Sequence, residues 1–383
     1  MDFNLSEDLS LLAQTVRKFA EEELEGLAGQ LDREHRFPVE VVRQAGELGL
    51  MGVSVSEPYG GSGLGNLASS IITEELSRAC ASTGVTISVH NSLVCGPVDK
   101  FGSEALKQKY LPRLATGEWL GAYALTEAEA GSDAANQQTV AEKHGDRYVL
   151  NGTKLWITSG AFADFFVVFA RTSIPKNGNH SDGITAFAIE KGTPGLKPGK
   201  LEEKLGIRAS STTELLLENC EVAEEQVIGE VGKGFKIAMD TLDGGRIGIG
   251  SQAVGIMQAC LDASLAYSRE RHQFGRPIGS FQAIQWKLAE MATGLEAARL
   301  LVRKAAWLRD RGEPCTLAAS MAKLHASVAV NRAADEAVQI HGGAGYTTDF
   351  PVERYMRDAR ITEIYEGTTE IQHLVIARHL AAR

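Results

Sequence analysis

The part of the chain that follows Gly234 contains four long stretches in which apolar residues recur every three or four positions. These stretches cover about 235–270, 281–311, 316–341 and 368–381. In the second stretch, Leu301, Ala305 and Leu308 fall on one stripe, which is the pattern of an amphipathic helix. Long antiparallel helices bury such stripes against one another as a bundle. We therefore predict a C-terminal four-helix bundle domain over residues 233–383.

The first third of the chain also favours helices. Apolar residues recur at helical spacing in 6–27, where Ser6 is placed to cap the first turn. Further helical patterns cover 38–50, 67–95 and 103–116. Pro97 and Gly102 are expected to break the chain between the last two patterns. These features predict an N-terminal helical domain over residues 1–121.

The pattern changes to strands in the middle of the chain. Tyr148–Leu150 and Lys154–Thr158 are separated by Asn151 and Gly152, a pair that favours a two-residue hairpin turn. Further runs rich in β-branched and aromatic residues cover 165–170, 184–189 and 214–217. We predict a β-barrel-like domain over residues 122–232. The fold class expected for the whole chain is mainly α with this central β domain.

Composition narrows the classes of partner and location. The formal net charge of −10 disfavours nucleic acid or an anionic membrane surface as the main partner. Five widely spaced cysteines without a CxxC pair indicate reduced, buried thiols, and the nine histidines show no HExxH spacing, so we expect no metal. The longest apolar run, Phe165 to Ala170, is too short for a membrane span, which needs about 20 residues. With no signal peptide visible, we expect a cytoplasmic bacterial protein, or a processed mitochondrial matrix protein.

One glycine-rich segment imitates a nucleotide-binding motif. The glycines between Gly60 and Gly65 approach a GxGxxG pattern, but the third glycine counted from Gly61 is replaced by Asn66. The flanking patterns are helical and do not form βαβ units. We interpret this segment as an ordinary loop. The sequence also contains no GxxxxGK[ST] and no GxSxG motif.

Three separated segments combine polar side chains, glycine and aromatic residues in a way that packing alone does not require. They run from Tyr123 to Asp133, from Lys154 to Ser159 and from Ile361 to Gln372. A hydroxyl beside a strand end, followed by a Trp-Ile-Thr strand, suits a flat heteroaromatic ring held by stacking and a few hydrogen bonds. The alternative is the edge of a β domain with its loop.

Seven motifs in one order make the pattern specific. They are YALTEAEAGSD, KLWITSGAFAD, LGIRASSTTEL, LDGGRIGIGSQAVGI, RERHQFGRPIGSFQ, QIHGGAGYT and ITEIYEGTTEIQ. The chain resembles the acyl-CoA dehydrogenase family nearly from end to end, and most of all its short-chain branch, whose substrate is butyryl-CoA. The helical, β-barrel, helical architecture of that family agrees with the domain order predicted above.

The resemblance implies FAD as the cofactor. It places Trp156 and Thr158 against the flavin ring and Thr126 at its edge, whereas Trp156 taken alone is better read as a core aromatic and Arg271 as a solvated surface arginine. The implied diphosphate and adenine contacts are made across a subunit interface, where the fork of an arginine suits a diphosphate. The full set of implied cofactor residues is Tyr123, Leu125, Thr126, Ser132, Trp156, Ile157, Thr158, Arg271, Gln273, Phe274, Gln282, Gln339, Gly342, Gly343, Thr368 and Glu370.

The resemblance also implies that Glu366 is the base that removes the α-proton of the substrate. Its backbone N–H would help to polarise the thioester carbonyl. From the residues alone, Glu363, Glu366 and Glu370 could merely favour the start of a helix. Some branches of the family place the base on the helix that begins near Gly234, but Gly244 and Gly245 stand at that position here.

The implied substrate contacts come from Ser132, Asp243, Arg246 and Gly367. Asp243 and Arg246 could instead be a simple ion pair one helical turn apart. The sequence departs from the usual family pattern at two places. Ala128-Glu129 replaces a Pro-Gly pair and Ser159 replaces a commoner Asn, so substrate choice or flavin potential could differ.

The expected reaction is oxidation of a short acyl-CoA to the trans-2-enoyl-CoA, with electrons passed to an electron-transfer flavoprotein. A homotetramer is expected from the family, and no nucleic acid or membrane partner is expected. A preference for short branched acyl-CoA, a flavin oxidase on the same fold, and a non-enzymatic FAD-bound scaffold are the alternatives that the sequence leaves open.

Overall fold

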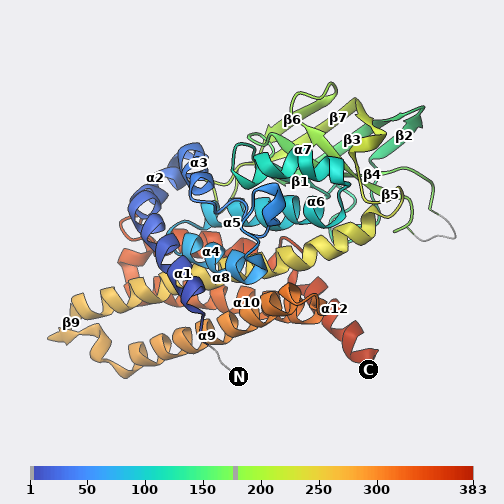
Figure 1. Cartoon of the computed structure of the whole chain (residues 1–383). Helices are drawn as coiled ribbons and strands as arrows, with labels where there is room; N and C mark the ends of the chain where they lie inside the picture. Colours follow the sequence, from blue (N-terminus) through green and yellow to red (C-terminus); the bar gives the residue numbers. More distant parts are fainter. Residues whose placement is uncertain (1–3, 176–179, 383) are drawn as a thin grey trace.

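Helices, a central sheet and helices again follow one another along the chain (Figure 1). The computed structural model describes residues 4–175 and 180–382. The N-terminal helices are α1 (Glu7–Ala20), α2 (Gly26–Glu34), α3 (Val39–Glu47), α4 (Gly65–Ala79), α5 (Ala81–Val89), α6 (Gly96–Phe101) and α7 (Glu104–Ala115). The predicted fold class is confirmed in outline: the chain is mostly helical, with helical segments on both sides of a central mixed sheet.

The first helices show how local sequence sets their ends. The side chain of Ser6 accepts a hydrogen bond from the backbone N–H of Leu9 at 3.3 Å, so the predicted cap of α1 is confirmed. The helical path continues past residue 27, through a π-helical turn, to Glu34. Pro97 does not break the chain as predicted. It follows the π-helical turn His90–Cys95, within a helical path that continues from α5 into α6. A π-helical turn changes the local hydrogen-bond pattern of the helix, and the path continues through the proline without a break.

The central sheet consists of eight strands in the order β6-β7-β3-β2-β4-β5-β8, with β1 pairing in parallel to β4. The strands are β1 (Gly121–Ala124), β2 (Val140–His144), β3 (Arg147–Thr158), β4 (Phe165–Arg171), β5 (Ile184–Glu190), β6 (Leu196–Leu201), β7 (Thr212–Ala223) and β8 (Val227–Ile228). The buried side chains of β4 and β5 form much of its core. The path of paired strands ends at β6 and β8, so closure into a barrel stays a prediction.

The predicted hairpin at Asn151 and Gly152 is wrong. β3 runs without a turn through both residues, and its pairing with β7 shifts register between Leu150 and Gly152, which is a β-bulge. A Cβ atom at Gly152 would lie 2.4 Å from Oγ1 of Thr139, so glycine is needed here for close packing. The hairpin turn lies earlier, between His144 of β2 and Arg147 of β3.

The C-terminal helices are α8 (Gly234–Glu270), α9 (Gln282–Asp310), α10 (Thr316–His341), α11 (Val352–Arg360) and α12 (Thr369–Ala381). A small hairpin of β9 (His272–Gln273) and β10 (Arg276–Pro277) joins α8 to α9. α8 is the most enclosed of these helices, because it packs against α4, α9 and α10. The sequence analysis did not predict α11. No helix in the described ranges is long and apolar enough to cross a membrane.

His90 joins the N-terminal helices to the sheet. Its ring is fully buried, with Nε2 3.0 Å from the carbonyl oxygen of Leu114 and Nδ1 3.0 Å from the backbone nitrogen of Gly121. A neutral ring that donates from Nε2 and accepts at Nδ1 satisfies both contacts. A proton on Nδ1 would oppose the Gly121 N–H, and burial lowers the pKa of His90 to about 4.

We predict that His90 makes the fold sensitive to acid. Because the folded-state pKa lies below the ordinary value, the unfolded chain binds the proton first. The stability contribution is therefore intact above about pH 6.5 and is lost as the pH falls toward 4, by on the order of 3 kcal/mol. Thermal melts of the parent and of His90→Gln between pH 7 and 4 check this. The two midpoints should converge as the pH falls, and parallel curves would contradict the prediction.

Candidate active site

Glu366 lies in the short turn between the 3₁₀ helix Ile361–Glu363 and α12. Glu366 and Gly367 both have positive φ angles, of 50° and 94°. Such a conformation is uncommon for a residue with a side chain and persists where neighbouring contacts impose it. Here the carbonyl oxygen of Gly367 accepts hydrogen bonds from Lys323 Nζ at 2.7 Å and from Gln372 Nε2 at 2.8 Å. Thr368 then caps α12, since its hydroxyl accepts from the N–H of Ile371.

The carboxylate of Glu366 is buried and, in the described part of the chain, lacks a partner for one of its oxygen atoms. Its Oε2 atom is buried and has no hydrogen-bond partner. Removal from water raises the pKa of Glu366 to about 7, although the positive charges of Lys323 and Arg246 act in the opposite direction. A carboxylate with a pKa near neutrality accepts a proton more readily than an exposed one. Nearby Glu363 pairs instead with Arg360, so the three acids of this segment are not equivalent.

α8 leaves room for this carboxylate by having no side chain at Gly245. A Cβ atom at Gly245 would lie 1.7 Å from Glu366 Oε2 and 2.9 Å from Cδ2 of Leu93. A side chain at residue 245 and the carboxylate of Glu366 would therefore occupy the same volume. An acidic side chain at position 245 and Glu366 in its present position are mutually exclusive.

Asp243 and Arg246 form the ion pair that the sequence analysis gave as the alternative. Arg246 Nη1 lies 2.7 Å from Asp243 Oδ1, and both side chains are buried. Thr316 donates to the second oxygen of Asp243 at 2.5 Å. The Nε atom of Arg246 is buried without a partner, so this guanidinium still has an unused donor close to Glu366.

The β domain contributes residues from the ends of two strands. Tyr123 of β1 has a buried hydroxyl without a partner, and burial together with the charge of Glu366 raises its pKa. The carbonyl oxygen of Thr126 accepts from the N–H of Leu155 at 2.9 Å, which places the segment after β1 beside the end of β3. Leu125 and Ile157 are buried, whereas Ser132 is exposed.

Trp156 is not a core aromatic. Its side chain is 58% exposed, and its φ angle of 57° is unusual for a residue of this size. Thr158 follows it at the end of β3 and is partly exposed. The strand end therefore presents an indole and a hydroxyl at the surface of this chain, where a ligand can reach both.

A buried ion pair that the sequence analysis missed joins these two segments. Lys154 Nζ lies 2.6 Å from Glu127 Oε1 and also donates to the carbonyl oxygen of Leu125 at 3.1 Å and to Gln137 Oε1 at 3.0 Å. Burial lowers the pKa of Lys154 to about 8, and Glu127 opposes this effect. The pair fixes Thr126 relative to Trp156, because Thr126 is adjacent to Glu127 and Trp156 lies two residues after Lys154. One sign of this pair is present in the sequence: Lys154 is a charged residue within a strand whose other residues suit packing.

The remaining predicted residues lie elsewhere in the chain. Arg271, Gln273 and Phe274 belong to the hairpin between α8 and α9, which Figure 1 shows at the opposite end of the molecule from β3. The ring of His341 stacks on Tyr267 with centroids 4.3 Å apart, so the end of α10 lies beside the end of α8. All seven of these residues are exposed, and we call them the distal group: Arg271, Gln273, Phe274, Gln282, Gln339, Gly342 and Gly343.

A single chain does not bring the distal group to Glu366. Lys323, which contacts Gly367, lies roughly 27 Å along α10 from His341 at about 1.5 Å per residue. The structure thus assembles Tyr123, Arg246 and Glu366 in one place, close to the segments that carry Thr126 and Trp156. It leaves the distal group at the far end of the helices.

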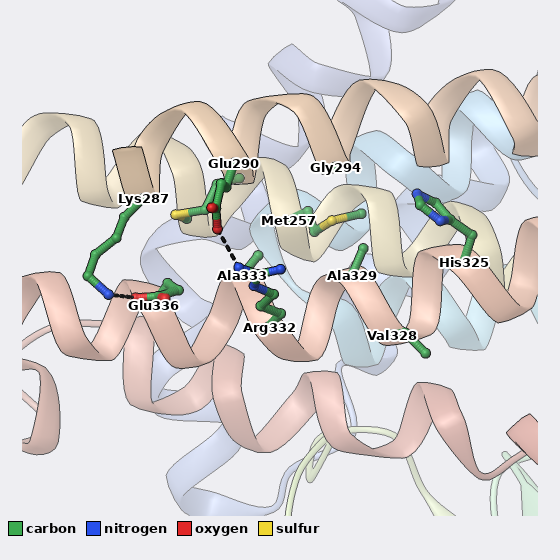
Figure 2. Close-up of a pocket in the computed structure, with 11 residues that line it drawn as sticks. Met257, Lys287, Glu290, Gly294, His325, Val328, Ala329, Arg332, Ala333 and Glu336 are labelled. Carbon is green, nitrogen blue, oxygen red and sulfur yellow. Dashed lines mark hydrogen bonds and ion pairs between the residues drawn. The ribbon is translucent and has the colours of Figure 1, made fainter. Parts of the chain in front are cut away.

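A cleft of about 240 Å³ lies between α9 and α10, with Met257 of α8 among its lining residues (Figure 2). Four of its charged side chains pair across it, Lys287 with Glu336 and Arg332 with Glu290. None of the predicted site residues lines the cleft. Its charges compensate one another, so we do not assign the chemistry to it.

Comparison with known proteins shows the family of the chain. Family models match the chain for the acyl-CoA dehydrogenase N-terminal domain (residues 6–118), middle domain (122–220) and C-terminal domain (232–381). The short-chain specific acyl-CoA dehydrogenase of Clostridium acetobutylicum is 52% identical over 98% of this chain and 99% of its own.

Two solved structures cover all of this chain and are covered completely by it. Butyryl-CoA dehydrogenase from Megasphaera elsdenii is 45% identical with a TM-score of 0.97. A chain from work on the electron transferring flavoprotein of Acidaminococcus fermentans is 48% identical with a TM-score of 0.98. The chain therefore belongs to the acyl-CoA dehydrogenase family, most resembles its short-chain members, and is an oxidoreductase that acts on acyl-CoA.

Proposed function

We propose that this protein oxidises a short-chain acyl-CoA to the trans-2-enoyl-CoA and that Glu366 removes the α-proton. The observation that carries the proposal is the buried, unpartnered Oε2 atom of Glu366, whose pKa burial raises to about 7. The Cα–H bond of the substrate breaks with its proton going to this oxygen. The β-hydrogen leaves with its electron pair as hydride, and FAD when bound supplies the acceptor at N5.

The backbone of the same turn supports the substrate carbonyl. In the described part of the chain, the N–H of Glu366 donates to no other group. An unused donor next to the base suits the oxygen of a thioester, on which negative charge develops as the α-proton leaves. Arg246 lies near Glu366 and pairs with Asp243, and Gly367 follows Glu366 in the chain, which supports a substrate site lined by these residues.

The residues present fit FAD, which is expected for the family. The exposed indole of Trp156 and the hydroxyls of Thr126 and Thr158 would hold the flavin ring. In the distal group, Arg271 would bind the diphosphate, and the positions that a Cβ would occupy at Gly342 and Gly343 face open space, so a ligand can approach the backbone there. Because the distal group lies far from Trp156 in one chain, we propose that a second copy supplies it.

We further propose a homotetramer that passes electrons to an electron-transfer flavoprotein. Trp286, Leu300 and Trp307 of α9 are 64%, 39% and 48% exposed, and their spacing by multiples of seven places them on one face of the helix. A stripe of exposed apolar side chains on a long helix favours packing against another copy. The similarity to a chain from the electron transferring flavoprotein work supports the partner.

Glu366→Gln should abolish catalysis while leaving FAD bound. The amide has nearly the shape of the carboxyl group but cannot accept the proton, and a positioned base typically contributes about 10²–10⁴-fold. Anaerobic flavin bleaching by butyryl-CoA measures the rate, and the visible spectrum reports bound FAD. Glu363→Gln in the same turn is the control and should bleach normally. A Glu366→Gln enzyme that still bleaches within tenfold of the parent rate would refute the assignment of the base.

Gly245→Ala should slow flavin bleaching. Expressed as free energy, this loss of rate should exceed the loss of folding stability. The added Cβ requires Glu366 Oε2 to move, because the two atoms would lie only 1.7 Å apart. A displacement of about 1 Å in a reacting group can cost on the order of 10²-fold. Gly294→Ala on α9 is the matched control, since its Cβ would meet no atom closer than 3.9 Å. Equal rates for both variants would show that Glu366 does not occupy this volume during the reaction.

Light scattering should give about four times the chain mass of 41.2 kDa. Replacing both Trp286 and Trp307 by Glu places charges on the exposed stripe of α9, so the mass should fall and bound FAD should be lost with it. Leu11→Glu, an equally exposed change on α1, should leave the mass unchanged. A parent protein that is monomeric and retains FAD would contradict the shared cofactor site.

A further inference from the structure

Lys323 lies near the middle of α10 and is completely buried. In the described part of the chain, Lys154 is the other fully buried lysine, and it has the carboxylate of Glu127 at 2.6 Å. Lys323 has no carboxylate within 4.0 Å; its described hydrogen bond goes to the carbonyl oxygen of Gly367 at 2.7 Å. An ammonium group buried without an ion pair is costly to the fold. Its placement therefore calls for a reason beyond stability.

The contact of Lys323 falls on the residue that follows Glu366. Gln372, which is also fully buried, donates to the same carbonyl oxygen at 2.8 Å and approaches the carbonyl oxygen of Glu366 at 3.5 Å. Two donors from two different helices thus hold one peptide group. That peptide group belongs to a turn with two consecutive positive φ angles, which local preference alone does not maintain.

The direction of this peptide group sets the geometry of the reaction. Rotation of the Gly367 carbonyl would change ψ of Gly367 and φ of Thr368 and break both hydrogen bonds. Gln372 would then also lose its contact with the Glu366 carbonyl, whose orientation depends on ψ of Glu366 and φ of Gly367. The carboxylate would leave the space beside Gly245, and the unused N–H of Glu366 would point elsewhere. The hydrogen bonds of Lys323 and Gln372 therefore hold both the carboxylate of Glu366, which is the proposed base, and the N–H of Glu366, which is the proposed donor to the substrate carbonyl.

Lys323 also acts on Glu366 through its charge. The groups that face Glu366 are Tyr123 from β1, Arg246 from α8, Lys323 from α10 and Tyr365 from the same turn. Of these, Arg246 is positively charged, and Lys323 is charged below about pH 8, because burial lowers its own pKa to about 8. Both positive charges lower the pKa of Glu366 against the effect of burial, Lys323 more strongly. Arg246 already shares its charge with Asp243 at 2.7 Å.

We propose that Lys323 is a positioning residue of the reaction, which holds the Glu366–Gly367 turn in its active conformation and keeps the carboxylate ionised, with Gln372 as the second support of the turn. This inference rests on the proposed role of Glu366 as the base. Lys323 touches neither reacting atom in this scheme, so its effect passes entirely through Glu366.

The test compares two variants. Lys323→Met keeps the length of the side chain but removes its charge and its hydrogen-bond donor, whereas Lys323→Arg keeps the charge and the donor. The FAD-loaded enzymes are mixed anaerobically with butyryl-CoA, and flavin bleaching is followed from pH 6 to 9. We expect Lys323→Met to bleach about 10–100-fold more slowly, with the pH midpoint moved upward because Glu366 loses a positive neighbour. Lys323→Arg should recover part of the rate and return the midpoint toward that of the parent.

Two controls separate positioning from packing. Lys18→Met makes the same chemical change at an exposed site on α1 and should leave rate and midpoint unchanged. Gln372→Leu removes the neutral donor alone, so the rate should fall without a shift of the midpoint. If Lys323→Met fails to fold, Lys323→Gln, which keeps a donor without charge, takes its place and should still move the midpoint upward.

An unshifted midpoint in every folded Lys323 variant, or a parent rate in Lys323→Met, overturns the proposal. These results are distinguishable from failure of the proposed function. If Glu366→Gln bleaches normally, the base is wrong. If Glu366→Gln is inactive while Lys323→Met behaves as the parent, Glu366 is the base and the positioning role of Lys323 is wrong.

Discussion

The structure around the site depends on keeping one carboxylate oxygen out of water without a partner. Burying an unpaired carboxylate opposes folding, so the neighbouring elements have to hold Glu366 in place. α8 provides space at Gly245, α10 provides the charge of Lys323, and the sheet closes the other side with Tyr123. Together these features place a carboxyl group with a pKa near neutrality in an enclosed region.

A second set of contacts holds α11, the helix from which the chain leads into the turn that carries Glu366. Arg357 of α11 binds Asp32 through two nitrogen atoms, at 3.0 and 2.7 Å, and also reaches the carbonyl oxygen of Leu205. The neighbouring Asp358 accepts from the N–H of Ile207 at 2.5 Å. One short helix thus contacts the N-terminal helices and the β domain, and the chain leads directly from it to Glu366. Bidentate arginine–carboxylate contacts suit this task because they fix orientation as well as distance.

Sequence periodicity was sufficient for the long helices and for the order of the segments, because burial of one face imposes a repeat that local residues show. Sequence patterns gave a wrong prediction where the same residue type can serve either of two structural roles. Asn151 and Gly152 were read as a turn, but Gly152 serves close packing against Thr139 within a bulged strand. The pairing of Lys154 with Glu127 and the contact of Lys323 with Gly367 escaped prediction, since both join residues far apart in sequence. α11 also escaped prediction, although Val352, Tyr355 and Ala359 recur at helical spacing, because the segment spans only nine residues and most of them are charged.

The separation of the distal group from Glu366 gives α8 a role that its sequence does not show. This helix carries Asp243, Gly245 and Arg246 near Glu366 and leads into Arg271 at its end, roughly 39 Å from Gly245 at about 1.5 Å per residue. α8 is buried against α4, α9 and α10, which leaves it little freedom to bend. Under the proposed sharing of FAD between copies, one rigid helix would support the substrate side of one site and the phosphate side of another. The spacing of the sites would then follow from the length of α8.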